Sequence, residues 1–364
     1  MINRLLATLV KHIDHYLMGL VAALLIIGLI TLFSASGESF ERVSGQLINI
    51  CAALTIMWIA ANVPLHYLSR IALPLYVVGL VLLLGVAVAG EVVNGARRWL
   101  NLGFTRIQPS ELMKIAVPLL LAWYFDRYEA ILKPRNFALG AVLVIVPVLL
   151  IARQPDLGTA LLVTAAGFYV LFLAGLSWKI LLGLGLVGGA SMPFLWSMLH
   201  DYQRQRILTL LDPSQDPLGA GYHTIQSTIA LGSGGFFGKG WLNGTQSHLD
   251  FLPERTTDFI FAVYAEEFGM IGNLILMVLF LLVIGRGLVI AANAPTLFTR
   301  LLAGAITLTF FTYAFVNMGM VSGILPVVGV PLPLISYGGT SLVTILFGVG
   351  LLMSIHTHRR LVQT

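Results

Sequence analysis

The sequence predicts an all-α polytopic integral membrane protein with about ten transmembrane helices. Of its 364 residues, 58% are hydrophobic and only 10% are charged, and the mean hydropathy is +0.91. Residues 301–355 contain no Asp, Glu, Lys, Arg or His. A soluble domain of this size does not carry so much apolar surface, so the composition excludes that class and favours helices packed in hydrocarbon.

Ten apolar runs, separated by polar segments, predict the spans. The first is longer than the apolar region of a signal peptide, so we interpret it as a retained span. The fourth begins at Pro109, a residue that suits the first turn of a helix. Without an internal repeat or a segment long enough for a soluble domain, residues 1–364 are interpreted as one membrane domain. The runs are 16–36, 46–64, 70–90, 110–125, 136–152, 157–175, 178–199, 259–286, 301–322 and 338–356.

The distribution of cations predicts the orientation in the membrane. Ten spans place both termini on one side, and cytoplasmic loops carry an excess of Lys and Arg. The side that holds the termini has eleven cations: Arg4, Lys11, Arg70, Arg127, Lys133, Arg135, Lys179, Arg286, Arg300, Arg359 and Arg360. The opposite short loops have five: Arg42, Arg97, Arg98, Arg106 and Arg153. Both termini are therefore expected in the cytoplasm. The net charge of +5, spread over short loops, indicates contact with anionic lipid and no nucleic acid.

A large extracytoplasmic loop at about 200–257, between the seventh and eighth spans, follows from this orientation. It contains basic residues such as Arg204 and a glycine-rich run, Gly232–Gly240. That run lacks the P-loop pattern and follows no predicted strand, so it does not indicate nucleotide binding. Short amphipathic helices with hinges between them are expected here. His223 and His248 lack the spacing of metal ligands, which argues against a zinc site.

Three of the five outward cations lie in one short loop, at Arg97, Arg98 and Arg106. Because these cations oppose the orientation bias, they need another reason to be there, and phosphate or pyrophosphate binding is one. Ordinary solvated loop charges in contact with lipid headgroups are the alternative.

The segment Gln108-Pro-Ser110-Glu111-Leu-Met-Lys114 starts the fourth span. Glu111 and Lys114 are three residues apart, so they share one face of the helix. Charged residues inside a membrane favour a functional cavity filled with water. The alternative is a structural ion pair that lets a helix end tolerate the edge of the bilayer.

Two further segments can reach the same cavity. Asp156, in the outer turn between the fifth and sixth spans, either caps the next helix or faces the cavity. The segment Leu325–Ser341 carries three prolines and several glycines between two spans. Irregular backbone at membrane depth requires protein or water beside it, which predicts a second cavity wall. A packing hairpin is the alternative.

Asp258 ends the long polar loop where the chain re-enters hydrocarbon, three residues after Arg255. A carboxylate at such a boundary is costly unless it has a partner or a function. Together with the outer arginines, it indicates a site for an anionic, lipid-linked polar molecule. Spacing alone does not separate an enzyme from a transporter.

These motifs resemble the SEDS family of shape, elongation, division and sporulation proteins, over the chain from Ser34 to His358. Gly244–Ser247 and Val327–Pro333 are more similar to the elongation member than to the division member. Thr256 stands where many relatives have His. The motifs that carry the resemblance are Gly95-Ala-Arg-Arg-Trp99, Gln108–Lys114, Gln154-Pro-Asp-Leu-Gly-Thr159, Asp201-Tyr-Gln-Arg-Gln-Arg206, Leu252-Pro-Glu-Arg-Thr-Thr-Asp-Phe259 and Ile335-Ser-Tyr-Gly-Gly339.

The resemblance implies a peptidoglycan glycosyltransferase of the bacterial inner membrane that polymerises lipid II on the periplasmic side, for cell elongation and rod shape. It implies a class B penicillin-binding protein as transpeptidase partner, contact with the elongation machinery, and glycan held on undecaprenyl pyrophosphate. The essential acidic residue of the family corresponds to Asp258. Arg42, Arg106, Glu111, Lys114 and Asp250 match its functional cavity. With these, the substrate-binding candidates are Arg97, Arg98, Gln108, Ser110, Asp156, Arg204 and Arg255.

In this interpretation Asp258 acts as general base on the acceptor hydroxyl. The arginines, Lys114 or a divalent cation (Mg or Mn) neutralise the pyrophosphate that leaves. No organic cofactor is expected. Three hypotheses compete with an elongation polymerase: a lipid II flippase, a non-catalytic scaffold for the transpeptidase, and a division-specific polymerase.

Overall fold

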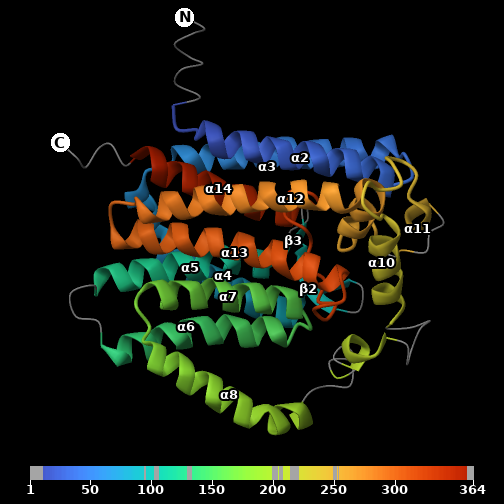
Figure 1. The fold of residues 1–364 in the computed structure, drawn as a ribbon. Coiled ribbons are helices and arrows are strands. Elements are labelled where there is room, and N and C mark those ends of the chain that lie inside the picture. The colour runs from blue at the N-terminus through green and yellow to red at the C-terminus, as the bar shows by residue number, and fades with distance from the viewer. Residues whose placement is uncertain are drawn as a thin grey trace, which may run out of the picture.

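The computed structural model describes residues 11–93, 96–101, 106–128, 133–198, 204, 208–213, 221–248, 252 and 254–358. Its long helices run side by side as a bundle (Figure 1). The two ends of the described chain meet at one end of this bundle, where the rings of His12 and His358 stack with their centroids 4.7 Å apart. The strands and the short helices α10 and α11 lie toward the other end (Figure 1).

In the described part of the chain, seven helices are long and apolar enough to cross a membrane. They are α2 (His15–Ala35), α3 (Phe40–Asn62), α4 (Leu65–Ala89), α6 (Pro134–Ala152), α12 (Ile260–Ala292), α13 (Leu297–Val321) and α14 (Thr340–Thr357). Further helices are α5 (Pro109–Arg127), α7 (Leu157–Leu173), α8 (Trp178–Met198), α10 (Tyr222–Ser233) and α11 (Thr245–His248). Each predicted apolar run overlaps one of the longer helices, so the prediction of a mainly helical, polytopic membrane protein is confirmed.

Local chemistry explains where several helices begin. Asp14 accepts hydrogen bonds from the N–H groups of Tyr16 and Leu17 at the start of α2, and Asp156 accepts one from Thr159 at the start of α7. These bonds satisfy donors that have no partner within the helix. Pro109 occupies the first position of α5, as predicted.

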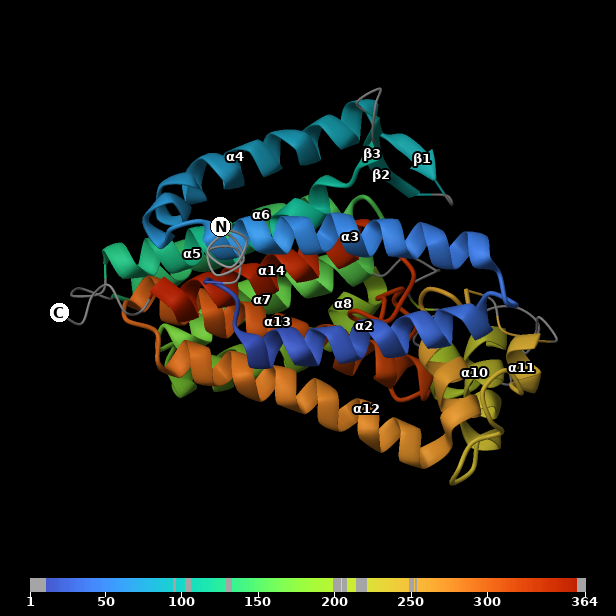
Figure 2. The same ribbon diagram turned by 90° about the horizontal axis from the view of Figure 1, so that it is seen from above.

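Helix α14 lies inside the bundle, next to α3, α13 and α5 (Figure 2). Gly350 makes close packing against α3 possible, because a Cβ at this position would clash with the carbonyl oxygen of Met57. Small residues allow such close approach between membrane helices. Helix α8 is different: it lies apart from the other long helices (Figure 1) and exposes most of its described side chains.

A small antiparallel sheet, absent from the sequence prediction, follows α4. It consists of β1 (Glu91–Val93), β2 (Ala96–Asn101) and β3 (Arg106–Ile107), in the order β1-β2-β3. Glu91 pairs with Trp99, and Leu100 pairs with Ile107. The Asn94-Gly95 dipeptide between two β-prone stretches is the sequence signal for a hairpin that could have found it. The sheet matters for the functional site because it carries the outer arginines Arg97, Arg98 and Arg106.

Helix α12 is broken at Gly269, whose φ is +64° and ψ −160°. The glycine-rich run of the long loop packs against this break. The carbonyls of Glu266 and Glu267 accept hydrogen bonds from the N–H groups of Lys239 and Gly240, at 3.0 Å each. The run therefore supplies partners for backbone groups that the break sets free. The run thus packs against the break in α12, while the loop around it contains the short helices α10 and α11.

The side chains of the two glutamates strengthen the same junction. Glu266 is fully buried and accepts hydrogen bonds from Lys239 Nζ at 2.6 Å and from the hydroxyl and N–H of Thr245 at 2.9 Å. Glu267 accepts a hydrogen bond from the Ser34 hydroxyl of α2. The break is thus tied both to the loop and to the first helix.

We predict that Gly269→Ala destabilises the fold. Its positive φ disfavours an L side chain, and the added Cβ would clash with the backbone N of Gly238, so we expect a loss of about 2–4 kcal/mol of unfolding free energy. Thermal unfolding in detergent measures it. Gly183→Ala on α8, where nothing lies within 4 Å of an added Cβ, is the control; equal melting temperatures for the two variants would contradict the prediction.

Candidate functional site

A polar cavity of about 160 Å³ lies at the end of the bundle where α5, α7 and α14 begin. Because α14 runs from this cavity to His358, the cavity lies at the opposite end from the two termini. Its walls come from β2, from the start of those three helices, and from the irregular segment before α14. The lining residues are Arg98, Gln108, Glu111, Lys114, Asp156, Gly158, Thr159, Leu162, Gly329, Val330, Pro331, Thr340 and Ser341.

Asp156 has both of the roles that the sequence left open. Its Oδ1 accepts the N–H of Thr159 at 3.1 Å and caps α7. Its Oδ2 faces the cavity, where it accepts a hydrogen bond from Gln108 Nε2 at 3.0 Å and lies 4.0 Å from Arg98 Nη1. This carboxylate therefore orients a glutamine and an arginine on the cavity wall.

Lys114 forms the inner wall and is almost fully buried. Its Nζ donates to Glu111 Oε1 at 2.6 Å and to the hydroxyl of Tyr313 at 2.7 Å. Glu111 Oε2 accepts a further hydrogen bond from Thr344 at 3.1 Å. The predicted shared face of Glu111 and Lys114 is confirmed, and their pair joins α5 to α13 and α14. A buried ion pair is tolerated when such hydrogen bonds satisfy it.

The irregular segment between α13 and α14 forms the second wall, as predicted. Asn317 of α13 is fully buried, and its Nδ2 donates to the carbonyl of Val330 at 2.7 Å and to the carbonyl of Asp258 at 2.8 Å. A Cβ added at Gly329 would lie 3.3 Å from Asp258 Oδ2. Gly329 lines the cavity and Asp258 does not, so the Asp258 carboxylate lies directly beside the cavity lining, next to Gly329.

The Asp258 carboxylate differs from the other acids of the site because it accepts no hydrogen bond from the described residues. Burial is the main cause that raises the pKa of its carboxyl to about 6. The charge of Glu254 also raises this pKa, and Arg98 lowers it. A carboxylate with this pKa is ionised at neutral pH and can accept a proton.

Arg42 holds the turn that carries Asp258. Its Nη1 donates to the hydroxyl of Thr256 at 3.2 Å. On the other side of the turn, Tyr337 N donates to the Thr256 carbonyl at 2.9 Å and the Ser336 hydroxyl donates to the Thr257 carbonyl at 2.6 Å. Arg42 therefore contacts the Asp258 turn and not the cavity lining.

Of the predicted arginines, the cavity lining includes Arg98 but neither Arg97 nor Arg106. Successive residues of a strand point to opposite faces, and Arg97 Nη1 donates to the Ala87 carbonyl at 3.4 Å. Arg106 Nε lies 3.2 Å from Glu91 Oε2 on the small sheet. Of these arginines, Arg98 thus lines the cavity beside Lys114, and the buried Nε of its guanidinium has no partner among the described residues.

The remaining predicted residues lie elsewhere. Arg204 donates to the carbonyls of Trp196 and Ser197 at the end of α8, at 3.1 and 2.8 Å. Ser110 is buried near the cavity but does not line it, and Arg255 is half-buried in the turn before Asp258. Asp250 lies outside the described residues. The sequence reasoning missed Tyr313 and Thr344, because an isolated polar residue within an apolar helix carries no spacing signal.

Metal ligation was tested on the donor groups present. Among the described residues, no group of three or more His, Cys, Asp or Glu side chains lies close enough together to hold a metal ion. These side chains therefore do not form a protein cage for Mg or Mn.

Comparisons with known proteins point to one family. The family model of the cell cycle proteins FtsW, RodA and SpoVE matches residues 14–361. The peptidoglycan glycosyltransferase MrdB of Escherichia coli strain K12 is 52% identical, over 97% of this chain and 95% of the relative.

Two solved structures share the fold. One, described as the structural coordination of polymerization and crosslinking by a peptidoglycan synthase complex, contains a chain that is 37% identical, with a TM-score of 0.84 over 96% of this chain and 99% of that one. The rod shape determining protein RodA of Thermus thermophilus is 32% identical, with a TM-score of 0.73 over 95% and 97% of the two chains.

We predict that Lys114→Met costs about 3–5 kcal/mol of unfolding free energy, because it leaves Glu111 charged and buried without its partner. The double variant Glu111→Gln with Lys114→Met removes both charges and is expected to recover most of this loss. Thermal unfolding of the purified variants measures both. Additive losses in the double variant would show that the two side chains are not coupled.

Proposed function

Because this chain belongs to the FtsW/RodA/SpoVE family of cell cycle proteins, we propose that it is a peptidoglycan glycosyltransferase. It polymerises lipid II into β-1,4-linked glycan strands and releases undecaprenyl diphosphate. The observation that carries the proposal is the Asp258 carboxylate, which lies beside Gly329 of the cavity lining and accepts no hydrogen bond from the described residues. The high identity to a peptidoglycan glycosyltransferase supports it.

The chemistry needs one base. As the 4-hydroxyl oxygen of the acceptor sugar attacks the anomeric carbon of the donor, its proton passes to Asp258. The bond between that carbon and the pyrophosphate oxygen breaks, and the electron pair leaves with the pyrophosphate. Attack from the face opposite the leaving group inverts an α-linked donor into a β-linked product, so no second nucleophilic carboxylate is required.

The leaving group needs positive charge more than a proton. Arg98 is suited to this role because its side chain is 31% exposed and its Nε has no partner among the described residues. The ammonium of Lys114 is already paired with Glu111 and bonded to Tyr313. We therefore assign phosphate binding to Arg98 and the shape and polarity of the inner wall to Lys114. Should a divalent cation take part, phosphate oxygens would supply most of its ligands.

The biological setting follows from the same proposal. The chain is a multi-pass protein of the bacterial inner membrane, with both termini in the cytoplasm and the cavity on the periplasmic side. Its cation distribution supports this orientation. A class B penicillin-binding protein is the proposed partner, in keeping with a structural relative that belongs to a polymerising and crosslinking complex. Similarity to a rod shape determining protein favours the elongation machinery over division.

Two other functions make different use of the cavity. A lipid II flippase would also need a polar path and broken helices, but it would not need a base with a raised pKa. A scaffold for the transpeptidase would need neither. A carboxylate that lacks hydrogen-bond partners and has its pKa raised to about 6 thus favours the enzyme.

We predict that Asp258→Asn lowers the rate of lipid II polymerisation by at least roughly 100-fold, since the amide cannot accept the proton. Glu254→Gln, which removes the neighbouring exposed carboxylate, is expected to keep most of the activity. Gel analysis of glycan length, with the purified chain and its transpeptidase partner, measures both. If a correctly folded Asp258→Asn protein polymerises at the wild-type rate, Asp258 is not the base.

The pH profile gives an independent check. The rate is expected to rise with pH and reach half its maximum near pH 6, where the Asp258 carboxyl loses its proton. Glu254→Gln removes a negative charge that raises this pKa, so its rate curve should shift to lower pH. Glu91→Gln, on the small sheet, is the control and should not shift the curve. A profile that Glu254→Gln leaves unchanged would contradict the assignment.

A further inference from the structure

A groove lies between α2 and α12 at the end of the bundle that holds the termini. It has a volume of about 640 Å³ and is open along one side. Its floor is formed by Gly19 of α2 and Gly285 of α12, and an added Cβ at either glycine would meet nothing within 4 Å. The side chains of Leu281 and Leu282 beside it are 57% and 51% exposed. The groove is therefore apolar, and no described part of the chain fills it.

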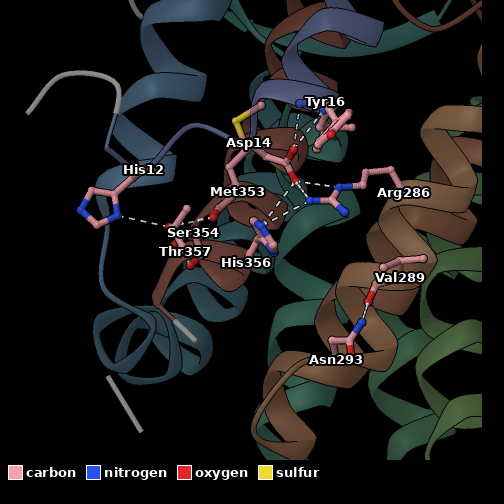
Figure 3. A network of polar contacts seen from close by, with 11 residues as sticks. His12, Asp14, Tyr16, Arg286, Val289, Asn293, Met353, Ser354, His356 and Thr357 are labelled. Atoms are coloured by element: carbon pink, nitrogen blue, oxygen red, sulfur yellow. Dashed lines mark hydrogen bonds and ion pairs between the residues drawn. The ribbon is translucent and has the colours of Figure 1, made fainter. Parts of the chain in front are cut away.

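A fixed cation closes one end of the groove. Arg286 lines it together with His15, and its guanidinium lies 5.6 Å from the Tyr16 ring. Figure 3 shows how Asp14 holds this guanidinium: Arg286 Nε and Nη2 lie 2.8 and 2.7 Å from Asp14 Oδ2. Nη2 also lies 3.3 Å from His356 Nε2.

The geometry of Arg286 leaves donors for a ligand. Asp14 is buried, so it orients the guanidinium without occupying the groove. The Arg286 side chain is 24% exposed, and its Nη1 has no partner among the described residues. A guanidinium that is already oriented loses little freedom when it binds an anion.

The wider charge of this end also favours an anion. The described carboxylates here are those of Asp14 and Asp126; the first is paired with Arg286, and the second accepts the N–H of Phe298 at 2.8 Å. The described cations at this end are more numerous: Lys11, Arg70, Arg127, Lys133, Arg135, Lys179, Arg286 and Arg300. Basic residues at the membrane surface attract anionic lipids.

We propose that the groove is a binding site for one anionic glycerophospholipid. An acyl chain lies over Gly19 and Gly285, and the phosphate accepts hydrogen bonds from Arg286 Nη1 and from His15. The lipid fastens α2 to α12 beside the Asp14–Arg286 pair. Arg286 follows Asp258 by 28 residues, so at about 1.5 Å per residue the two sites lie at most roughly 40 Å apart along α12. The lipid site is independent of the glycosyltransferase proposal.

The test fills the groove without disturbing the contacts around it. Gly285→Leu and Gly19→Leu add a side chain where the protein leaves open space. Gly189→Leu on α8 is the matched control, because nothing lies within 4 Å of a Cβ there either. The full chain is purified in mild detergent and titrated with phosphatidylglycerol or phosphatidylcholine, and native mass spectrometry counts the lipids retained. Thermal unfolding of the same samples reports stabilisation.

We expect the wild type and Gly189→Leu to retain one phosphatidylglycerol, at least fivefold more often than phosphatidylcholine, and to melt at higher temperature with it. Gly285→Leu and Gly19→Leu should lose both effects, and His15→Ala should weaken the preference for the anionic lipid. Equal retention by wild type and Gly285→Leu, or equal retention of the two lipids, would overturn the proposal. The proposal would also be overturned if Gly285→Leu kept its lipid but lost the binding of a membrane helix from another protein. The groove would then hold that helix and not a lipid. Polymerisation is not the readout, so failure here leaves the proposed function untouched.

Discussion

Each backbone N–H and C=O that lies among the helices needs a partner within the protein, because hydrocarbon offers none. The described residues show this at Gly269 and at the cavity, where backbone groups find their partners in distant segments. At Gly269 the freed carbonyls of α12 bond to the glycine-rich run of the long loop. At the cavity, Asn317 donates to the carbonyls of both Asp258 and Val330. The irregular backbone that forms the site therefore depends on these cross-links.

Buried charges also need partners within the protein. The carboxylates at and beside the cavity differ in how many hydrogen-bond partners they have. Asp156 has a helix N–H and a glutamine as hydrogen-bond partners, and Glu111 has an ammonium and a threonine. The carboxylates of these two acids are therefore largely occupied by hydrogen bonds that hold the fold together. Asp258 has its backbone held and its carboxylate without a hydrogen bond from the described residues. A buried carboxylate that lacks hydrogen-bond partners and lies beside a cavity is the one available for proton transfer.

The fold class was predictable because hydropathy is a property of long segments. The prediction does not change when the boundary of an apolar run is misplaced by several residues. The charged motifs were also predictable, since Glu111 and Lys114 lie on one helix and their spacing alone brings them together. Which arginine lines the cavity was not: Arg97 and Arg98 are adjacent, and only the strand geometry of β2 separates their directions. The Gly269 break was equally hidden, because its partners lie about thirty residues earlier in the loop.

Helix α12 connects the two ends of the molecule. It begins two residues after Asp258 and carries Arg286 near its far end. Between them, the loop bonded around Gly269 fixes one part of the helix, and the Asp14–Arg286 pair fixes another against α2. The first nine residues form a short helical segment before the break at Gly269, and this segment is held by the loop and by Ser34 of α2. The position of Asp258 is therefore set mainly by contacts on the outer side of the break, whereas contacts at Arg286 set how α12 packs against α2.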